Sequence, residues 1–539
     1  MLPFKVSALQ REQMGSPSIS LEKGSYRMRR PTGATYEPHN PSRIPKRRPT
    51  PTMSSTLTTF LPFILAFACL TCFGFAYYLY STRWAAPTTS PRTTHTDHDA
   101  LITDESLQAI RFDLHADVHA LRERNNSSEK FLAYLPHSGF HNQRIAFENA
   151  LVLAHLLNRT LLAPPVRLGT PLPYFKFDRL KRLLALSGKD GLFHCGTPLG
   201  RRFRPQECFD YFDYTFVPWD WLVDLTPVRQ QQHIVQCWNM TDEWLEDTLR
   251  IEKQVDVYTL KDAWAYHYRF VDHPYDVPPN LRYKTRMPID DLARVPERVL
   301  QLGSLFGSSR LHLKNPRNFR LRTMIRRSMV PNVPGLEDTA DSIKRTLGGS
   351  YLGAHVRLGD GQFAVQGQNS TMSIWKQLVA QIFVLDADVL EKAMVPQHNS
   401  QWIDLLKPAA DYANLETQPP LNLSCRRPKH RSPSLAPLNI PLFISTDAKD
   451  PQRHPFFEIF LHTFPCTFFL SDFSPKLESL HRRNDFDGVP LRDHLVPFLN
   501  AMIIGKAWKA VGTEGSTFSA FITDVLWRHY HGLEIHQRG

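Results

Sequence analysis

The fold is decided by residues 131–165, which read FLAYLPHSGFHNQRIAFENALVLAHLLNRTLLAPP. Residues 131–135 are a short apolar run, which is typical of a buried strand. After a loop, residues 143–157 place apolar side chains at helical spacing, and residues 160–163 form a second apolar run that Pro164 ends. A strand, a loop, a helix and a strand in this order predict a β–α–β crossover and therefore a parallel sheet.

The same pattern recurs in the C-terminal half of the chain. Strands are predicted at residues 351–358, 441–445, 467–470 and 508–511, and helices at residues 495–507 and 517–530. The sequence therefore predicts an α/β protein with two halves that meet near residues 330–345. A polar, proline-rich segment at residues 395–439 is interpreted as a loop insertion in the second half.

A membrane anchor is predicted near the N-terminus. Leu57–Tyr80 holds no charged residue and is long enough to cross roughly 30 Å of hydrocarbon. Residues 1–56 carry an excess of Lys and Arg, so we expect a disordered tail in the cytosol. Residues 81–106 are interpreted as a flexible stem. The remainder of the chain is then expected in the lumen of the Golgi or the ER, as in a single-pass type II membrane protein.

The charge distribution argues against a general nucleic-acid binder. The chain has 539 residues and a net charge of +12, and +7 of this charge lies in residues 1–52. A nucleic-acid-binding protein should carry its basic patch on the folded domain. We therefore predict no nucleic-acid partner, and we expect the lipid bilayer to contact the chain through Leu57–Tyr80.

Five of the seven cysteines follow the predicted anchor, where disulfides persist. They are Cys195, Cys208, Cys237, Cys425 and Cys466. Because five is odd, at least one of them must stay outside the intrachain disulfides. None has the CxxC or Cys/His spacing of a metal site, so no metal ligand is predicted.

Polar residues follow four of the predicted strands, and ligands bind at the carboxyl ends of parallel strands. The four loops are residues 137–144 (HSGFHNQR), 355–360 (HVRLGD), 445–447 (STD) and 512–519 (GTEGSTFS). The first and the fourth combine glycine with a helix N-terminus, which suits an anion, and Gly139 is expected to allow the first turn. Arg357 can hold a diphosphate with two parallel hydrogen bonds, and Asp447 can hold a ribose or a base.

Each of these residues also has a simpler interpretation. Arg357 can form an ion pair with Asp360 that only steadies the loop. Ser516 and Thr517 are ordinary residues at the start of a helix, and Asp447 can cap the helix that follows it. The functional interpretation depends on the conjunction of the four loops.

Taken together, the loops resemble the motifs of the protein O-fucosyltransferase superfamily, in its plant and fungal branch. The stretch HSGFHNQRIAFENALVLAHLLNRTLLAPP is similar to the first signature of the family, and AHVRLGD to its H-x-R motif with a nearby Asp. FISTDA is similar to its T-D strand end, and VGTEGSTFSAFITDVLWR to its last motif. The resemblance extends over most of residues 129–530.

The resemblance implies a GT-B-like architecture, in which two Rossmann-like domains face a cleft that holds GDP-fucose. We assign these domains to residues 107–340 and 341–539, preceded by the single transmembrane helix. The resemblance also implies an inverting transfer of fucose to a hydroxyl group of a protein or a glycan, with no bound metal and no cofactor.

The resemblance assigns roles to individual residues. Arg357 would stabilise the β-phosphate of the departing GDP, Asn142 would touch the nucleotide sugar, and Asp447 would recognise the nucleoside. The predicted substrate-binding residues are Gly139, Asn142, His355, Asp360, Asp447, Ser516, Thr517 and Phe518.

The chain departs from the family at the position of the general base. Relatives with a known base place a Glu directly before the Gly-Phe of the first loop, where this chain has Ser138. No carboxylate occurs between Phe131 and Phe147. His137 and His141 are therefore the predicted catalytic substitutes, and a base supplied from elsewhere in the chain is the alternative.

Two other functions compete with this interpretation. The first is a metal-dependent transferase, in which the pair Asp386 and Asp388 or the pair Asp485 and Asp487 would bind Mg²⁺ or Mn²⁺ through a sugar diphosphate. The second is a membrane-tethered protein that binds a nucleotide sugar but has lost catalysis.

Overall fold

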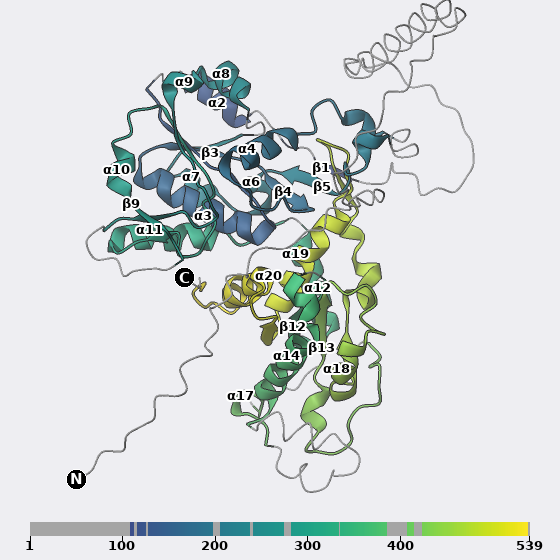
Figure 1. The fold of residues 1–539 in the computed structure, drawn as a ribbon. Coiled ribbons are helices and arrows are strands. Elements are labelled where there is room, and N and C mark those ends of the chain that lie inside the picture. Colours follow the sequence, from purple (N-terminus) through teal and green to yellow (C-terminus); the bar gives the residue numbers. More distant parts are fainter. Residues whose placement is uncertain are drawn as a thin grey trace, which may run out of the picture. The chain divides into compact units, whose positions relative to one another are not determined.

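The protein is described by a computed structural model, shown as a ribbon in Figure 1. The structure describes residues 108–110, 112, 116–124, 128–197, 205–237, 241–273, 282–333, 335–359, 361–384, 407–413, 415 and 423–536. The predicted tail, anchor (Leu57–Tyr80) and stem lie outside these residues. None of the helices within them is both long and apolar enough to cross a membrane. The anchor therefore stays a prediction.

The β–α–β crossover predicted from residues 131–165 is confirmed. β2 (Phe131–Ala133) leads into α3 (Phe140–Leu156) and then into β3 (Thr160–Ala163), which pairs with β2 in parallel. The other strands of this parallel sheet are β6 (Ile234–Gln236), β7 (Val257–Leu260) and β10 (Val299–Leu302). The strand order is β6-β3-β2-β10-β7.

Helices cover both faces of this sheet. Along β2, Leu132 packs into the same core cluster as α3. Its neighbours Phe131 and Ala133 point to the opposite face and pack with α2 (Ala116–Arg124) and α8 (Asp242–Leu249). Successive side chains of a strand alternate between faces. A parallel sheet that is buried on both faces explains why its strands are continuous apolar runs.

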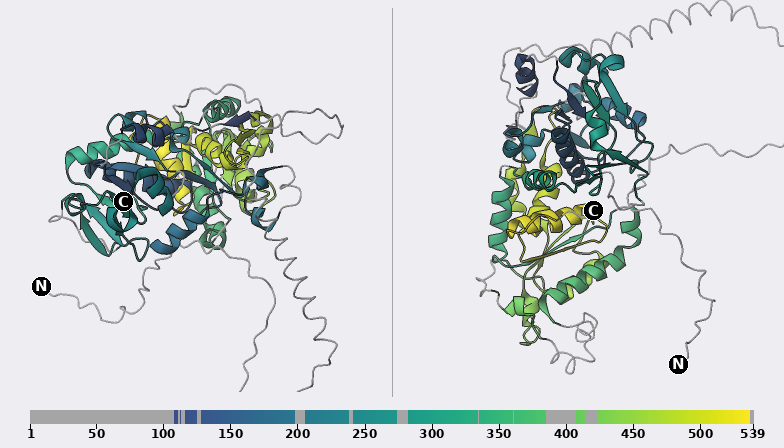
Figure 2. Two further views of the ribbon diagram at one scale, coloured as in Figure 1. Left: turned by 90° about the horizontal axis from the view of Figure 1, so that it is seen from above. Right: turned by 90° about the vertical axis from the view of Figure 1, so that its left-hand side faces the viewer.

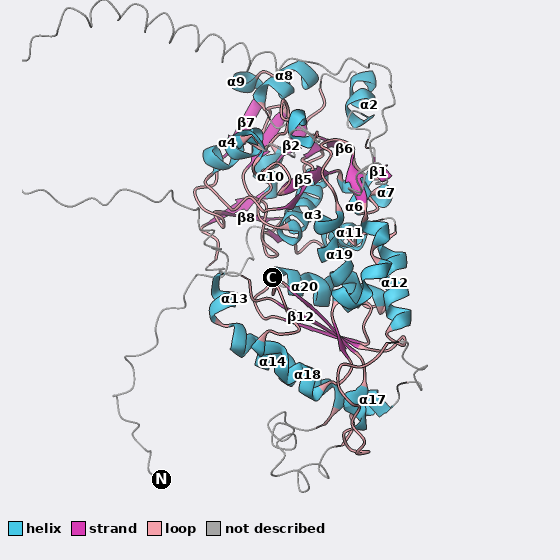
Figure 3. Ribbon diagram, turned by 90° about the vertical axis from the view of Figure 1, so that its right-hand side faces the viewer, coloured by secondary structure: helices cyan, strands magenta, loops and turns pink. Residues whose placement is uncertain are grey.

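A second parallel sheet forms in the C-terminal half, as predicted. Its strands are β12 (Leu352–Val356), β13 (Leu442–Thr446), β14 (Thr467–Phe468) and β16 (Lys509–Gly512), in the order β14-β13-β12-β16. α14 (Gly367–Ile382) packs on one face of this sheet and α19 (Arg492–Gly505) on the other (Figure 3). The right-hand view of Figure 2 shows the long green helix α14 on the far side of these strands from the yellow C-terminal helices.

In each of the two parallel sheets, the strand order reverses its direction at one point. From β2 the chain moves outward to β3 and β6, whereas β10 lies on the other side of β2. From β12 it moves outward to β13 and β14, whereas β16 lies on the other side of β12. Loops that leave neighbouring strands in opposite directions open a crevice at their carboxyl ends. The fold therefore predicts ligand sites after β2 and β10 and after β12 and β16.

The remaining strands extend this framework. β1 (Gln108–Ile110) pairs with β15 (Arg482–Asn484), β4 (Val166–Gly169) pairs antiparallel with β5 (Tyr214–Val217), and β8 (Tyr268–Val271), β9 (Thr285–Pro288) and β11 (Leu311–His312) form a three-stranded sheet. The sequence interpretation missed all of these, because each strand is short and has no strong apolar run.

Further helices flank these sheets. They include α4 (Phe177–Leu186), α10 (Ile289–Ala293), α11 (Pro316–Ser328), α12 (Leu336–Thr346), α13 (Gly361–Val365), α17 (Ala410–Ala413), α18 (Glu458–Thr463), α20 (Thr517–Ala520), the π-helix η9 (Phe521–Trp527) and α21 (Arg528–Tyr530). α11 packs on α3, and α12 packs on α19. The chain thus leaves the N-terminal half after α11 and enters the C-terminal half at α12, close to the meeting point predicted near residues 330–345.

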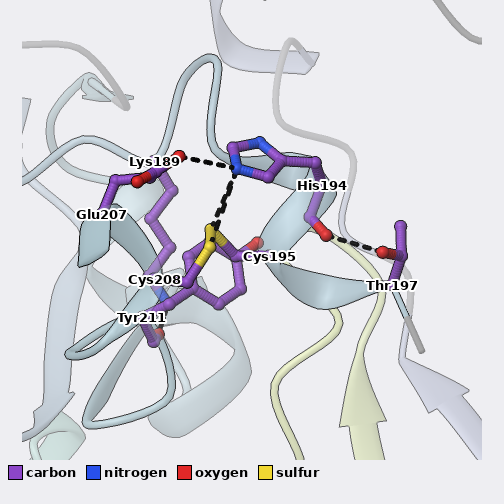
Figure 4. Close-up of a disulfide and its surroundings, with 7 residues drawn as sticks. All are labelled: Lys189, His194, Cys195, Thr197, Glu207, Cys208 and Tyr211. Atoms are coloured by element: carbon purple, nitrogen blue, oxygen red, sulfur yellow. Dashed lines mark hydrogen bonds and ion pairs between the residues drawn. A yellow bond between two sulfur atoms is a disulfide. The ribbon is translucent and has the colours of Figure 1, made fainter. Parts of the chain in front are cut away.

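The described residues fall into two compact units. Both sheets belong to the unit that contains Leu107–Gly188 and Phe212–Gly539, and Lys189–Tyr211 belongs to the other unit. Within the smaller unit, Cys195 and Cys208 form a disulfide (Figure 4). The proposed boundary between residues 340 and 341 stays a prediction.

The cysteine count is explained by two disulfides. Besides Cys195–Cys208, Cys425 in the predicted insertion is bonded to Cys466. Cys237 is buried and belongs to neither disulfide. The odd number of cysteines after the predicted anchor required at least one of them to stay outside the intrachain disulfides, and this residue is Cys237.

Candidate functional site

Hydrogen bonds hold together the three predicted loops of the second sheet. The backbone N–H of Arg357, directly after β12, donates to Oγ1 of Thr513 after β16, at 2.9 Å. The carboxylate of Asp447, directly after β13, accepts the backbone N–H of Leu358 at 2.7 Å and that of Gly359 at 3.0 Å. Loops predicted at separate strand ends therefore form one connected surface around Arg357.

This geometry gives Asp447 a structural role beside its predicted one. The resemblance predicts that its carboxylate recognises the nucleoside, but both of its oxygens bind the loop that carries Arg357. A Cβ atom at Gly359 would lie 2.6 Å from Oδ2 of Asp447, so a larger residue does not fit there. Asp447 is therefore a positioning residue for Arg357.

Arg357 itself is half-buried at the carboxyl edge of β12. Its Cζ lies 5.5 Å from the centroid of the Phe363 ring, within the range of a cation–π contact. Asp360, its predicted ion-pair partner in the simpler interpretation, lies outside the described residues. Variants of Arg357 and Asp360 distinguish the phosphate contact from the ion pair.

A pocket of about 180 Å³ joins the first and the fourth predicted loops. Its lining includes His141 and Arg144 from α3, and Ser516 and Thr517 at the start of α20. The loop after β10 also contributes, through residues 306–308. The pocket therefore lies where the strand order predicts a ligand crevice, and it contains two of the residues predicted from the fourth motif.

Ser516 has a second task in this pocket. It is the N-cap residue of α20, and its Oγ accepts the backbone N–H of Ser519 at 3.3 Å. The simpler interpretation of Ser516 as a cap is thus confirmed, although the residue also lines the pocket. Thr517 is exposed and lines the pocket.

A buried ion-pair network supports the pocket wall. Glu148 on α3 is fully buried and lies between two guanidinium groups. Its Oε1 accepts from Arg326 on α11 at 3.0 Å, and its Oε2 accepts from Arg144 at 3.4 Å. Two buried cations share one buried carboxylate, so this network fixes Arg144 where it lines the pocket.

The predicted role of His141 as a base is not supported by its hydrogen bonding. His141 lines the pocket, but its Nδ1 accepts the Nε–H of Arg144 at 3.4 Å. Burial, and to a lesser degree the Arg144 cation, hold the pKa of His141 well below its usual range. A neutral imidazole whose Nδ1 accepts must carry its proton on Nε2. His141 is thus a hydrogen-bond donor to a ligand and not a proton acceptor.

His137 is also unsuited to act as the base. It is buried, its Nε2 lies 2.7 Å from Oγ of Ser304, and its Nδ1 lies 2.8 Å from Oγ of Ser138. Burial, with a smaller contribution from Arg310, lowers the pKa of His137 to about 3. The imidazole therefore joins the loops after β2 and β10, and nothing in this geometry favours its predicted catalytic role.

The turn of the first loop is made by Ser138 and not by Gly139. Ser138 has φ of 65°, in the left-handed region, whereas Gly139 is extended, with φ of −72° and ψ of 172°. A Cβ atom at Gly139 would meet nothing within 4 Å. The expectation that Gly139 allows the turn is therefore wrong. The left-handed conformation of a serine marks local strain at the ligand-binding edge.

His355, predicted to bind substrate, is a structural residue. It is buried on β12, its Nδ1 lies 2.7 Å from Oγ of Ser519, and its ring packs edge-on against Phe518, with 5.0 Å between centroids. Burial, and then Arg357, lower the pKa of His355 to about 3. His355 and Phe518 thus fasten the loop after β16 to β12, and their predicted substrate contacts stay predictions.

Asn142 stands out among the predicted binding residues. It lies in the first turn of α3, and its Oδ1 is buried with no hydrogen-bond partner in the part of the chain that the structure describes. A buried acceptor without a partner costs about 1–3 kcal/mol, so a hydroxyl group of a ligand would remove a penalty here. This geometry agrees with the predicted sugar contact.

Several pocket residues were not predicted, and three of them carry a charged side chain. Arg144 was part of the quoted first motif, but nothing local showed that it lines the pocket. Arg282 lies on the approach to β9, and its Cζ stacks 4.0 Å above the Tyr266 ring. Asp524 lies on η9 and was part of the quoted last motif, as the acidic residue of its helix. That it was the acidic residue of this motif is the signal that could have identified it.

The residue pairs proposed for a metal-dependent transferase are also placed. Asp386 and Asp388 lie outside the described residues. Asp487 is buried, and its two oxygens accept from Oγ1 of Thr215 at 2.8 Å and from the backbone N–H of Val489 at 3.1 Å. Asp487 therefore fastens the loop after β15 and does not face a ligand.

One further cluster has the composition of a metal site. His194 Nε2 lies 3.6 Å from the sulfur atoms of both Cys195 and Cys208, and Figure 4 shows the three side chains together. The two sulfur atoms are bonded to each other. In this state they form a disulfide and not a pair of thiolate ligands.

Comparison with known proteins gives a short match and distant structural alignments. No protein-family model matches the chain. A segment of 38 residues is 60% identical to the curated O-fucosyltransferase 30 of Arabidopsis thaliana, and the match covers 7% of this chain and 8% of that protein. This match confirms the predicted resemblance to O-fucosyltransferases over that segment.

Among the solved structures, POFUT1 in complex with GDP aligns over 76% of this chain and 97% of its own, with 11% identity and a TM-score of 0.33. POFUT1 in complex with GDP-fucose aligns over the same shares of the two chains, with 12% identity and a TM-score of 0.32.

Proposed function

We propose that this chain is a membrane-anchored glycosyltransferase that transfers fucose from GDP-fucose to a hydroxyl group of a protein or a glycan. The transfer inverts the anomeric centre and uses no bound metal. The proposal places the enzyme in the Golgi or the ER, with residues 81–539 in the lumen.

One observation carries the proposal: the four predicted loops meet at the two points where the strand order reverses its direction. Arg357 is tied to the loops after β13 and β16, and the pocket brings His141 of the first loop together with Ser516 and Thr517 of the fourth. Loops that are far apart in the sequence thus combine cationic, hydroxyl and amide groups in the way that a sugar diphosphate requires. The short match to an O-fucosyltransferase favours fucose as the transferred sugar.

The chemistry follows from these groups. As the bond from C1 of fucose to the β-phosphate breaks, negative charge grows on the phosphate oxygens. Arg357 and Arg144 offer fixed cations for this charge, and preorganised charges are the largest single contribution in many enzymes. His141 lines the pocket and would donate its Nε2–H to an oxygen atom of the donor, and Oδ1 of Asn142 would accept a hydroxyl group of the sugar.

The two alternative functions predict different results for the same protein. A metal-dependent transferase would lose its activity in EDTA, and it would need a pair other than Asp485 and Asp487, since Asp487 is committed to structure. A binding protein without catalysis would bind GDP but never release it from GDP-fucose.

GDP is expected to raise the melting temperature of the full-length protein more than UDP does. A dissociation constant between a millimolar and a micromolar corresponds to about −4 to −8 kcal/mol of binding free energy. Ligand at about 100 times its dissociation constant adds about 2.7 kcal/mol of stability. The measurement is a thermal shift with GDP, GDP-fucose, GDP-mannose, UDP and UDP-sugars at equal concentrations. A larger shift with UDP than with GDP would contradict the assignment of the donor.

The topology is tested separately in intact microsomes. Protease added outside should leave residues 81–539 uncut, because the positive charge lies before Leu57–Tyr80. A glycosidase should increase the gel mobility of the protein, because the predicted lumenal part contains N-x-S/T sequons such as Asn158 and Asn369. Cleavage of the C-terminal part by external protease would overturn the proposed topology.

A further inference from the structure

The general base is missing from the first loop, and neither histidine there can replace it. Both imidazoles are neutral and hydrogen-bonded, His137 to two serines and His141 to Arg144. An inverting transfer to a hydroxyl group still has to remove a proton from that hydroxyl. The base must then come from another part of the pocket.

The pocket lining contains a single carboxylate among the described residues, that of Asp524. We propose that Asp524 is the general base of the transferase, a proposal that rests on the proposed function. Its carboxylate takes the proton of the acceptor hydroxyl as the acceptor oxygen bonds to C1 of fucose. The bond from C1 to the β-phosphate oxygen breaks at the same time, and its electron pair leaves with GDP.

The position of Asp524 fits this task. It lies eight residues after Ser516 on one continuous helical segment that begins at the pocket. A purely α-helical segment of this length would separate the two Cα atoms by about 12 Å, at about 1.5 Å per residue. Side chains lean toward the N-terminus of their helix, which shortens the distance from the carboxylate to the phosphate-binding end. In inverting glycosidases the two acting groups lie about 6.5–9.5 Å apart, on opposite sides of the sugar.

The helix is irregular at this place, which is a second and independent observation. Phe521–Trp527 forms a π-helix, a rare conformation that occurs frequently at functional sites. The π-helical turns carry both Asp524 and Val525 on the pocket side. We infer that the π-helical backbone orients the side chain of Asp524 toward the acceptor.

The charges around the pocket are compatible with a carboxylate. Arg144 and Arg282 line the same pocket, together with His141 and His536. The two guanidinium groups lessen the repulsion between Asp524 and the diphosphate of the donor. The backbone carbonyl of Asp524 also accepts the N–H of His536 at 2.9 Å, a bond that an isosteric side-chain replacement leaves in place.

The test uses the full-length protein and GDP-fucose alone, with water as the acceptor. Hydrolysis releases GDP and fucose, and the same base must take a proton from water. We expect Asp524→Asn to lower GDP release by about 10²–10⁴-fold, the usual contribution of a general base. The melting temperature and the thermal shift with GDP should stay close to those of the wild type. Asp524→Glu should recover part of the rate.

Glu458→Gln is the matched control, because Glu458 is exposed on α18, away from the pocket. It should release GDP at the wild-type rate. Near-normal GDP release by Asp524→Asn would overturn the proposal, and so would a loss of GDP binding in this variant, since Asp524 would then serve the donor. If the wild type binds GDP but releases none from GDP-fucose, the proposed function fails and the base fails with it. If the wild type releases GDP from GDP-fucose and only Asp524→Asn departs from its expected result, the proposed function stands and the proposal about the base fails.

Discussion

Arg357→Ala is expected to lower the rate of fucose transfer by about 10²–10³-fold, which corresponds to about 3–4 kcal/mol in the transition state. The guanidinium group stays protonated and can offer two donors to one phosphate. Its backbone N–H is already bound to Thr513, so the loop keeps this bond when the side chain is removed. The loss should therefore appear in the turnover number and not in the melting temperature. Turnover and melting are to be measured on the same preparation.

Two further variants separate catalysis from loop stability. Arg357→Lys keeps the charge but loses the paired geometry, and it should recover only a small part of the rate. If Arg357 only steadies the loop through an ion pair with Asp360, Arg357→Ala and Asp360→Ala should melt at similarly lowered temperatures with little change in turnover per folded molecule. Near-normal turnover in a well-folded Arg357→Ala would end the proposed role.

Glu148→Gln is expected to give the largest loss of stability, about 3–5 kcal/mol in the free energy of unfolding. The substitution removes the charge between Arg144 and Arg326, all three of which are buried. Two buried cations then lose their shared partner, and the pocket wall loses its support. Denaturant unfolding of the full-length protein measures the effect, and GDP binding should weaken in the same variant.

The control is Glu337→Gln, which removes one of two acidic partners of the buried Lys506. Glu337 lies 3.2 Å from Nζ of Lys506, and its side chain is 48% exposed. Lys506 keeps Asp341 at 2.7 Å when Glu337 is neutralised, so no buried charge loses its last partner and this variant should be close to the wild type. Equal losses of unfolding free energy in the two variants would contradict the stabilising role of the buried network around Glu148.

The sequence predicted the strands of the second parallel sheet and two strands of the first, β2 and β3, which are buried on both faces, but it missed β6, β7 and β10. β3 was predicted with its observed bounds, Thr160–Ala163. α3 begins at Phe140, three residues earlier than predicted. Phe140 packs against Phe498 and Phe521, whose ring centroids lie 4.6 and 5.6 Å away. Contacts between such distant parts of the sequence leave no local pattern, so this boundary could not be predicted.

The candidate site joins loops that the sequence identified, but the contacts of their individual residues could not be predicted. The loops that carry Arg357 and Ser516 follow strands with clear motifs, and the structure brings them together as expected. The roles of Asp447 and His137 depend on partners that are distant in the sequence, the Leu358 N–H and the Ser304 hydroxyl. Whether such a side chain meets a ligand or another loop is decided by tertiary contacts.

The central claim is that this chain releases GDP from GDP-fucose without a metal. The most direct measurement is the formation of GDP by the full-length protein with GDP-fucose as the only sugar nucleotide and EDTA present. We predict that GDP accumulates, that the rate is unchanged when Mn²⁺ replaces EDTA, and that UDP-sugars are not consumed. No GDP release under any of these conditions, or a release that EDTA abolishes and Mn²⁺ restores, would contradict the claim.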